Sequence, residues 1–182
     1  MNAAIAGLDL SATAAAIVSA PLRWDNNWSR VRSVVAGEGL RRDATDEERA
    51  RRCESIARTL LRFCDDNNVG QVWIEGYAFN QRTSAHTLGE VGGVVRLELV
   101  RAGIAIRTAN MSTARKLLLG KLPRKGAKVA AYEALRAAGC PAWTLDESDA
   151  FVCANLGLSE HAGAFCFATQ PPVVEKKVRV RK

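Results

Sequence analysis

The sequence predicts an α/β protein built on a mixed five-stranded sheet flanked by helices. Three short strand-like segments open the chain: Ala3–Leu10 and Ala14–Ser19 are apolar, and Arg30–Val35 alternates between polar and apolar residues. Strand-like and helical segments then alternate, which is typical of parallel strands joined by helices. With 48% hydrophobic and 25% charged residues among 182, the composition is that of one ordinary globular domain.

Each element has its own local signal. The three opening strands are close enough in sequence to form an antiparallel meander. A capping-box motif at Thr45 and helical spacing of apolar residues behind it predict a helix to about Asp65. The remaining expected elements are a strand at Val69–Glu75, a helix at Thr83–Ala102, a strand at Ile104–Thr108, and helices at Ser112–Gly120, Lys128–Gly139 and Asp146–Leu158.

The chain is expected to divide into one domain, residues 1–158, and a basic tail, residues 159–182. The last eight residues, Glu175–Lys182, carry five basic side chains and one acid. The sequence predicts neither a membrane span nor a secretory signal, because no apolar run approaches the required length and the N-terminus lacks a basic start. Five cysteines without CxxC spacing argue against a zinc site or a disulfide framework, as expected for a cytoplasmic protein.

Positive charge is concentrated in one internal block. The net charge is +7, and residues 115–128 contain six basic side chains and no acid. Such a block suits a polyanion such as nucleic acid, because neutralising phosphates releases counterions. A solvated face of the protein is the alternative reading of the same pattern.

Four acids are candidates for a metal site. Asp9 ends the first predicted strand and Glu75 ends the fourth; in parallel neighbours these ends meet at one edge of the sheet. Asp146 and Asp149 open the last helix three residues apart and share a face. Clustered carboxylates repel one another unless a cation lies among them, and oxygen ligands suit Mg²⁺ or Mn²⁺. Taken singly, each acid could equally be a turn, strand-end or helix-cap residue.

Five segments of the sequence resemble, in order, the RuvC family of Holliday-junction resolvases. They are GLDLSATAAAIV, VWIEGYAFN, SAHTLGEVGGVVR, RKLLLGKLPRKGAK and DESDAFVCA, which together span about Ala3 to Leu158. The likeness is greater to the phage-type members of this ribonuclease-H-like superfamily. It implies a ribonuclease-H-like fold and a homodimeric, Mg²⁺-dependent endonuclease. Such an enzyme cuts paired strands of a four-way DNA junction, leaves 5′-phosphate ends, and works in the bacterial cytoplasm or a phage-infected cell.

The resemblance also implies roles for individual residues. It assigns the catalytic, metal-binding acids to Asp9, Glu75, Asp146 and Asp149, around two Mg²⁺ ions for which Mn²⁺ would substitute. Some phage-type relatives carry an acid two residues before the last aspartate, so Glu147 remains an alternative to Asp146. The family's lysine at the start of the penultimate helix falls on Lys128, which would hold the scissile or an adjacent phosphate. Lys125 is the alternative to Lys128.

Further DNA contacts are expected outside the acid cluster. Phe79, chosen over Tyr77, would probe the junction centre, although packing in the core is the alternative for this aromatic side chain. Arg82 would contact phosphate. The basic block would add Arg115, Lys116, Lys121, Arg124 and Lys125. Gly89, Gly92 and Gly93 indicate close helix packing, either across a two-fold interface or against the protein's own sheet.

Two other functions are compatible with the sequence. A broader structure-selective nuclease would cut forks, flaps or RNA–DNA hybrids with the same acids, because substrate choice depends on loops and dimer geometry. A non-catalytic junction-binding protein is the second alternative. The acids argue against it, because a phosphate-binding protein gains nothing from carboxylates near DNA.

Overall fold

The computed structural model describes residues 4–11, 14–37, 39, 43–76, 85–120, 125–141 and 143–162. Its centre is a five-stranded sheet in the order β3-β2-β1-β4-β5. The strands are β1 Ala4–Leu10, β2 Ala15–Pro21, β3 Arg32–Ala36, β4 Val69–Glu75 and β5 Ala105–Ala109. The first three pair antiparallel, and β4 and β5 lie parallel to β1. The predicted mixed sheet is therefore confirmed.

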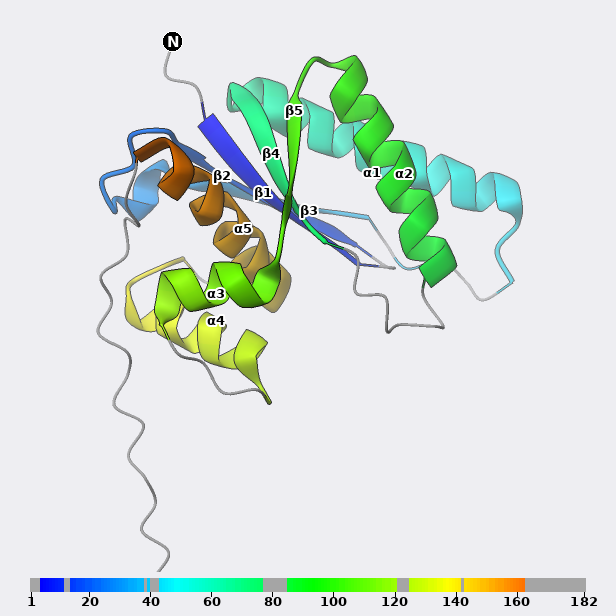
Figure 1. The fold of residues 1–182 in the computed structure, drawn as a ribbon. Coiled ribbons are helices and arrows are strands. Elements are labelled where there is room, and N and C mark those ends of the chain that lie inside the picture. Colours follow the sequence, from blue (N-terminus) through cyan, green and yellow to red (C-terminus); the bar gives the residue numbers. More distant parts are fainter. Residues whose placement is uncertain are drawn as a thin grey trace, which may run out of the picture.

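Helices cover both faces of this sheet (Figure 1). On one face lie α1 Asp46–Asp66 and α2 Ala85–Arg101. On the other lie α3 Met111–Leu119, α4 Ala127–Ala137 and α5 Leu145–Ala162. α1 begins with the expected capping box at Thr45. α5 runs four residues beyond its predicted end at Leu158, and in this added turn His161 contacts Gln71 of β4.

The third strand starts later than predicted. Residues Trp28–Arg30 form a short 3-10 helix instead of the beginning of the strand. Asn27 caps this turn, because its side chain accepts a hydrogen bond from the backbone N–H of Ser29. The strand therefore begins only at Arg32.

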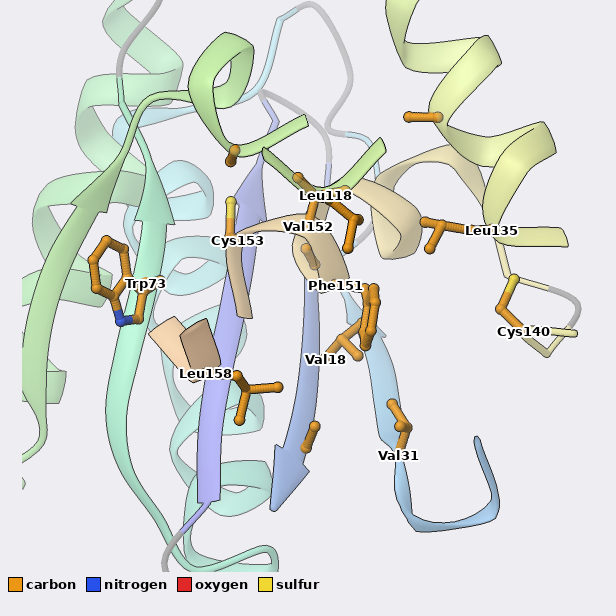
Figure 2. Packing of buried hydrophobic residues seen from close by; sticks show 14 of the residues in the cluster. Val18, Val31, Trp73, Leu118, Leu135, Cys140, Phe151, Val152, Cys153 and Leu158 are labelled. Atoms are coloured by element: carbon orange, nitrogen blue, oxygen red, sulfur yellow. The ribbon is translucent and has the colours of Figure 1, made fainter. Parts of the chain in front are cut away.

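Two hydrophobic cores lie on opposite faces of the sheet. The core under α5 includes the fully buried Phe151 together with Val18 and Leu135 (Figure 2). Around Phe151, Trp24, Trp28 and Trp143 form an aromatic cluster with ring centroids 5.0 to 5.5 Å apart. This cluster attaches the β2–β3 connection to the helical layer that carries the C-terminal acids.

Helix α5 packs against β1 and β4 closely enough to require glycine at two positions. A Cβ on Gly7 of β1 would lie 1.8 Å from the carbonyl oxygen of Ala150. A Cβ on Gly157 of α5 would lie 2.3 Å from the indole nitrogen of Trp73. These two contacts fix the height of α5 above the sheet, and so the distance between its acids and the ends of the strands.

Helix α2 carries an apolar stripe that none of the described residues covers. A Cβ on Gly89 or Gly93 would meet no described atom within 4 Å, so these two glycines do not serve close packing against the protein's own sheet. Leu97 and Val100 follow on the same side and are 49% and 63% exposed. None of the described helices is long and apolar enough to cross a membrane.

Candidate active site

The four predicted acids come from two strand ends and one helix. Asp9 lies near the end of β1 and Glu75 at the end of β4, which is the parallel neighbour of β1. Asp146 and Asp149 lie in the first turns of α5, which crosses β1. Asp9 and Asp149 are buried, with 5% and 1% of their surface exposed. The topology therefore brings these acids to one edge of the sheet, as the sequence predicted.

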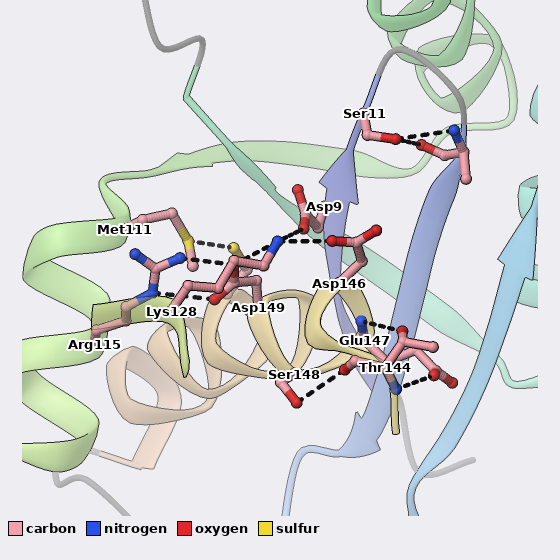
Figure 3. Close-up of polar contacts among 12 residues, drawn as sticks. Asp9, Ser11, Met111, Arg115, Lys128, Thr144, Asp146, Glu147, Ser148 and Asp149 are labelled. Atoms are coloured by element: carbon pink, nitrogen blue, oxygen red, sulfur yellow. Dashed lines mark hydrogen bonds and ion pairs between the residues drawn. The ribbon is translucent and has the colours of Figure 1, made fainter. Parts of the chain in front are cut away.

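The ammonium group of Lys128 lies between three of these carboxylates (Figure 3). Its Nζ is 3.1 Å from Oδ2 of Asp9, 2.7 Å from Oδ1 of Asp146 and 3.0 Å from Oδ2 of Asp149. Lys128 stands in the first turn of α4, and its side chain is 37% exposed. One positive charge thus holds together acids from β1 and α5.

A second cation reaches the cluster from α3. Arg115 donates from Nε to Oδ1 of Asp149 at 3.0 Å and from Nη2 to Oδ2 at 2.7 Å. This two-bond geometry fixes the plane of the Asp149 carboxylate. The Arg115 side chain is only 15% exposed, because its guanidinium is turned inward to Asp149.

Asp9 and Glu75 form a carboxyl pair. Burial raises the pKa of Glu75 to about 8, and the negative charge of Asp9 and a hydrogen bond to it add to the effect. Burial also raises the pKa of Asp9, although the charge of Lys128 opposes this. Two carboxyl groups can share a hydrogen bond only if one of them keeps its proton. The pair therefore shares one proton.

Lys128 remains charged despite its partial burial. Burial alone would lower the pKa of its ammonium group. The hydrogen bond to Asp146 and the charges of Asp9 and Asp149 outweigh burial, so the pKa of Lys128 is raised. The site thus contains a permanent cation surrounded by carboxylate oxygens.

The donor atoms at the site suit a divalent ion, although their present spacing is that of hydrogen bonds to an ammonium group. Oxygens from Asp9, Asp146 and Asp149 converge on one point where a cation, the Lys128 ammonium, already lies. Oxygen-only donors are what Mg²⁺ and Mn²⁺ prefer. In the described residues no group of three or more His, Cys, Asp or Glu side chains has the geometry of a metal site. The oxygens lie 2.7 to 3.1 Å from Nζ, the spacing of N–H···O bonds, whereas Mg²⁺ needs about 2.1 Å.

Glu147, the alternative fourth acid, forms different contacts. Its Oε2 accepts a hydrogen bond from the backbone N–H of Thr144 at 2.8 Å, and its Oε1 accepts one from the hydroxyl of Ser33 at 2.7 Å. Asp146, by contrast, contacts Lys128. These contacts favour Asp146 over Glu147 as the fourth acid.

Some of the other residues predicted to contact DNA are exposed, and the rest lie outside the part of the chain that the structure describes. Lys116 and Lys125 are exposed on α3 and just before α4. The contact with the acids therefore belongs to Lys128 rather than to Lys125. The remaining predicted residues, Tyr77, Phe79, Arg82, Lys121 and Arg124, lie outside the described residues.

Sequence reasoning placed Arg115 among the phosphate contacts and did not foresee its pairing with Asp149. A signal for this pairing was present in the sequence. Met111, Arg115 and Leu118 recur at helical spacing, and the two apolar members are buried. A basic residue within a buried stripe usually has an acidic partner.

Solved structures show the same arrangement of strands and helices. Thermus thermophilus RuvC superimposes with a TM-score of 0.63 at 16% identity, over 88% of this chain and 97% of that chain. T. thermophilus RuvC in complex with a Holliday junction substrate gives a TM-score of 0.62, also at 16% identity, over 88% and 96% of the two chains.

A third structure is similar over a smaller share of its length. The Cas12f1–sgRNA–target DNA complex matches at 15% identity with a TM-score of 0.50, over 84% of this chain and 38% of that chain. No family model and no curated protein sequence matches. At these identities the likeness establishes the fold, which is RuvC-like as predicted.

Proposed function

We propose that this protein is a metal-dependent endonuclease that resolves four-way DNA junctions. The observation that carries the proposal is the convergence of oxygens from Asp9, Asp146 and Asp149 on a single cation position. The RuvC-like fold supports it, because solved structures of this fold include RuvC with a Holliday junction substrate. The net charge of +7 is consistent with a DNA partner.

Each part of the site has a chemical task in this proposal. Asp9, Glu75, Asp146 and Asp149 would hold divalent ions, which supply an activated water and neutralise charge on the phosphodiester. Arg115 keeps the Asp149 carboxylate in one orientation. Lys128, partly exposed at the edge of the cluster, would hold a phosphate oxygen of the DNA.

We further propose that the protein acts as a homodimer through α2. Gly89, Gly93, Leu97 and Val100 form one stripe on this helix and have open space or high exposure. Small residues allow helix backbones to approach closely, and exposed apolar side chains gain from being covered. A two-fold dimer would present two identical sites to the two strands of a junction.

A strand-resolved cleavage assay on a synthetic four-way junction, with and without Mg²⁺, tests this function. The protein should nick two strands in Mg²⁺ and leave 5′-phosphate ends. Asp149→Asn should reduce the rate more than about 100-fold, whereas Asp66→Asn at the exposed end of α1 should not.

Other outcomes of the same assay would replace the proposal. Preferred cutting of forks, flaps or RNA–DNA hybrids would indicate a broader structure-selective nuclease. Tight junction binding without nicking in Mg²⁺ or Mn²⁺ would indicate a non-catalytic binding protein. Full activity of Asp149→Asn would refute the assignment of the acids.

A further inference from the structure

The side chain of Glu147 connects the first turn of α5 to the edge strand β3. The backbone N–H of Glu147 donates to the hydroxyl of Thr144 at 3.2 Å, and Glu147 Oε2 accepts from the Thr144 N–H at 2.8 Å. This reciprocal pair is a capping box at the start of the helix. The second oxygen, Oε1, accepts from Ser33 Oγ at 2.7 Å, a contact between residues 114 positions apart in the chain.

Ser33 provides a firm partner for this contact. It lies in the middle of β3, where it pairs with Val18 of β2, and it is half-buried. Val31, which directly precedes β3 in extended conformation, lies two residues earlier and belongs to the core under α5. The hydroxyl of Ser33 is therefore held by the sheet, on the side over which α5 lies.

The position of this contact affects the acids directly. Asp146 and Asp149 flank Glu147 on the same first turns of α5. The body of the helix is held by apolar packing, which is not directional and does not by itself fix the rotation of an end turn. A hydrogen bond to a carboxylate is directional and charge-assisted, so it can fix that rotation.

We propose that Ser33 and Glu147 are positioning residues that set the orientation of the two α5 acids toward the metal ions, and that Glu147 is not a metal ligand. This inference rests on the proposed function. The contact places Asp146 and Asp149 where their oxygens meet those of Asp9. This proposal gives Glu147 a structural task, whereas the sequence left it as an alternative metal ligand to Asp146.

Substitutions at Ser33 test the positioning role with a matched pair. Ser33→Ala removes the hydroxyl, whereas Ser33→Thr keeps it on a side chain that suits a strand. Mn²⁺ binding to the metal-free protein is measured by electron paramagnetic resonance, and kcat and KM are measured on the junction. Ser33→Ala should bind Mn²⁺ several-fold more weakly and lower kcat with little change in KM. Ser33→Thr should restore both values.

Substitutions on α5 test whether Glu147 is a ligand. Glu147→Gln should bind as many Mn²⁺ ions as the parent protein but several-fold more weakly, whereas Asp146→Asn should lose ligand oxygen and reduce the number bound. The double variant Ser33→Ala/Glu147→Gln should bind Mn²⁺ with the affinity of the weaker-binding single variant. The two losses do not add, because both changes break the same contact.

Each contrary result has a distinct meaning. Parent-like Mn²⁺ affinity and kcat in Ser33→Ala would overturn the positioning role. Loss of a bound ion in Glu147→Gln would show that Glu147 is a ligand. A parent protein that binds no Mn²⁺ and cuts no junction would overturn the proposed function, and this inference with it.

Discussion

Replacing Gly7 by alanine should push α5 away from β1 and separate the two halves of the acid cluster. The new Cβ would lie 1.8 Å from the carbonyl oxygen of Ala150 and 2.3 Å from the backbone nitrogen of Ala154. Real Cβ contacts are essentially never shorter than 3.0 Å, so the helix must move by about 1.2 Å, the difference between 3.0 and 1.8 Å. Both contacts are with backbone, which no side-chain rotation can relieve.

This displacement has two costs, one in folding stability and one in reaction rate. Inserting a methyl group into a packed core usually costs about 1–3 kcal/mol of folding free energy. We expect the upper end of that range for Gly7→Ala, because a whole helix has to shift. The acids on α5 move with the helix, and a misplacement of about 1 Å can lower a reaction rate by about 100-fold. The two effects are therefore of similar size in free energy, and cleavage should fall by about 100-fold.

Urea unfolding and junction cleavage together measure these effects. Gly70→Ala is the matched control, because Gly70 also lies in a strand and its Cβ would meet no described atom within 4 Å. The control should retain both stability and cleavage. A Gly7→Ala protein with parent-like stability and cleavage would show that α5 does not pack on β1 as described.

Three further predictions concern charge. Lys128→Met should reduce cleavage more than about 10-fold, while Arg62→Met at an exposed position on α1 changes it little, and equal losses would contradict the assignment of Lys128 to the site. The folded protein keeps the Glu75 proton up to about pH 8, whereas the unfolded chain loses it near the ordinary pKa of 4.5. Stability of the metal-free protein should therefore fall as the pH rises between these values, and Glu75→Gln should flatten this slope in urea unfolding; an unchanged slope would argue against the raised pKa. Deleting residues 175–182 should weaken junction binding and flatten its dependence on salt, because five basic side chains are lost; an unchanged slope would exclude the tail as a DNA contact.

The sequence alone determined the order of elements and the ends of the strands that carry acids. Local patterns were sufficient for this, because alternation predicts strands and helical spacing predicts helices from neighbouring residues. The position of Asp9 near the end of β1 and of Glu75 at the end of β4 followed directly. The parallel pairing of these two strands, inferred from their alternation with helices, then brought the acids to one edge of the sheet.

The sequence also left alternatives that only contacts could resolve. Asp146 and Glu147 are adjacent acids, and although helical spacing puts Asp146 on the face of Asp149, it does not show what Glu147 contacts. The structure favours different tasks for the two, because Asp146 contacts Lys128 while Glu147 contacts Thr144 and Ser33. Arg30 was predicted to begin the third strand but lies in the 3-10 turn Trp28–Arg30. The Asn27 side chain caps this turn, and the sequence pattern did not reveal that contact.

Only the tertiary structure decided how the cluster is neutralised. Lys128 and Asp9 are 119 residues apart, and Arg115 and Asp149 are 34 apart, so no local pattern links them. Whether their side chains meet depends on how deeply α5 packs on β1 and where α3 and α4 lie against it. Those positions result from the sum of many nondirectional contacts in the core, and the directional ion pairs form only after that packing has placed their partners.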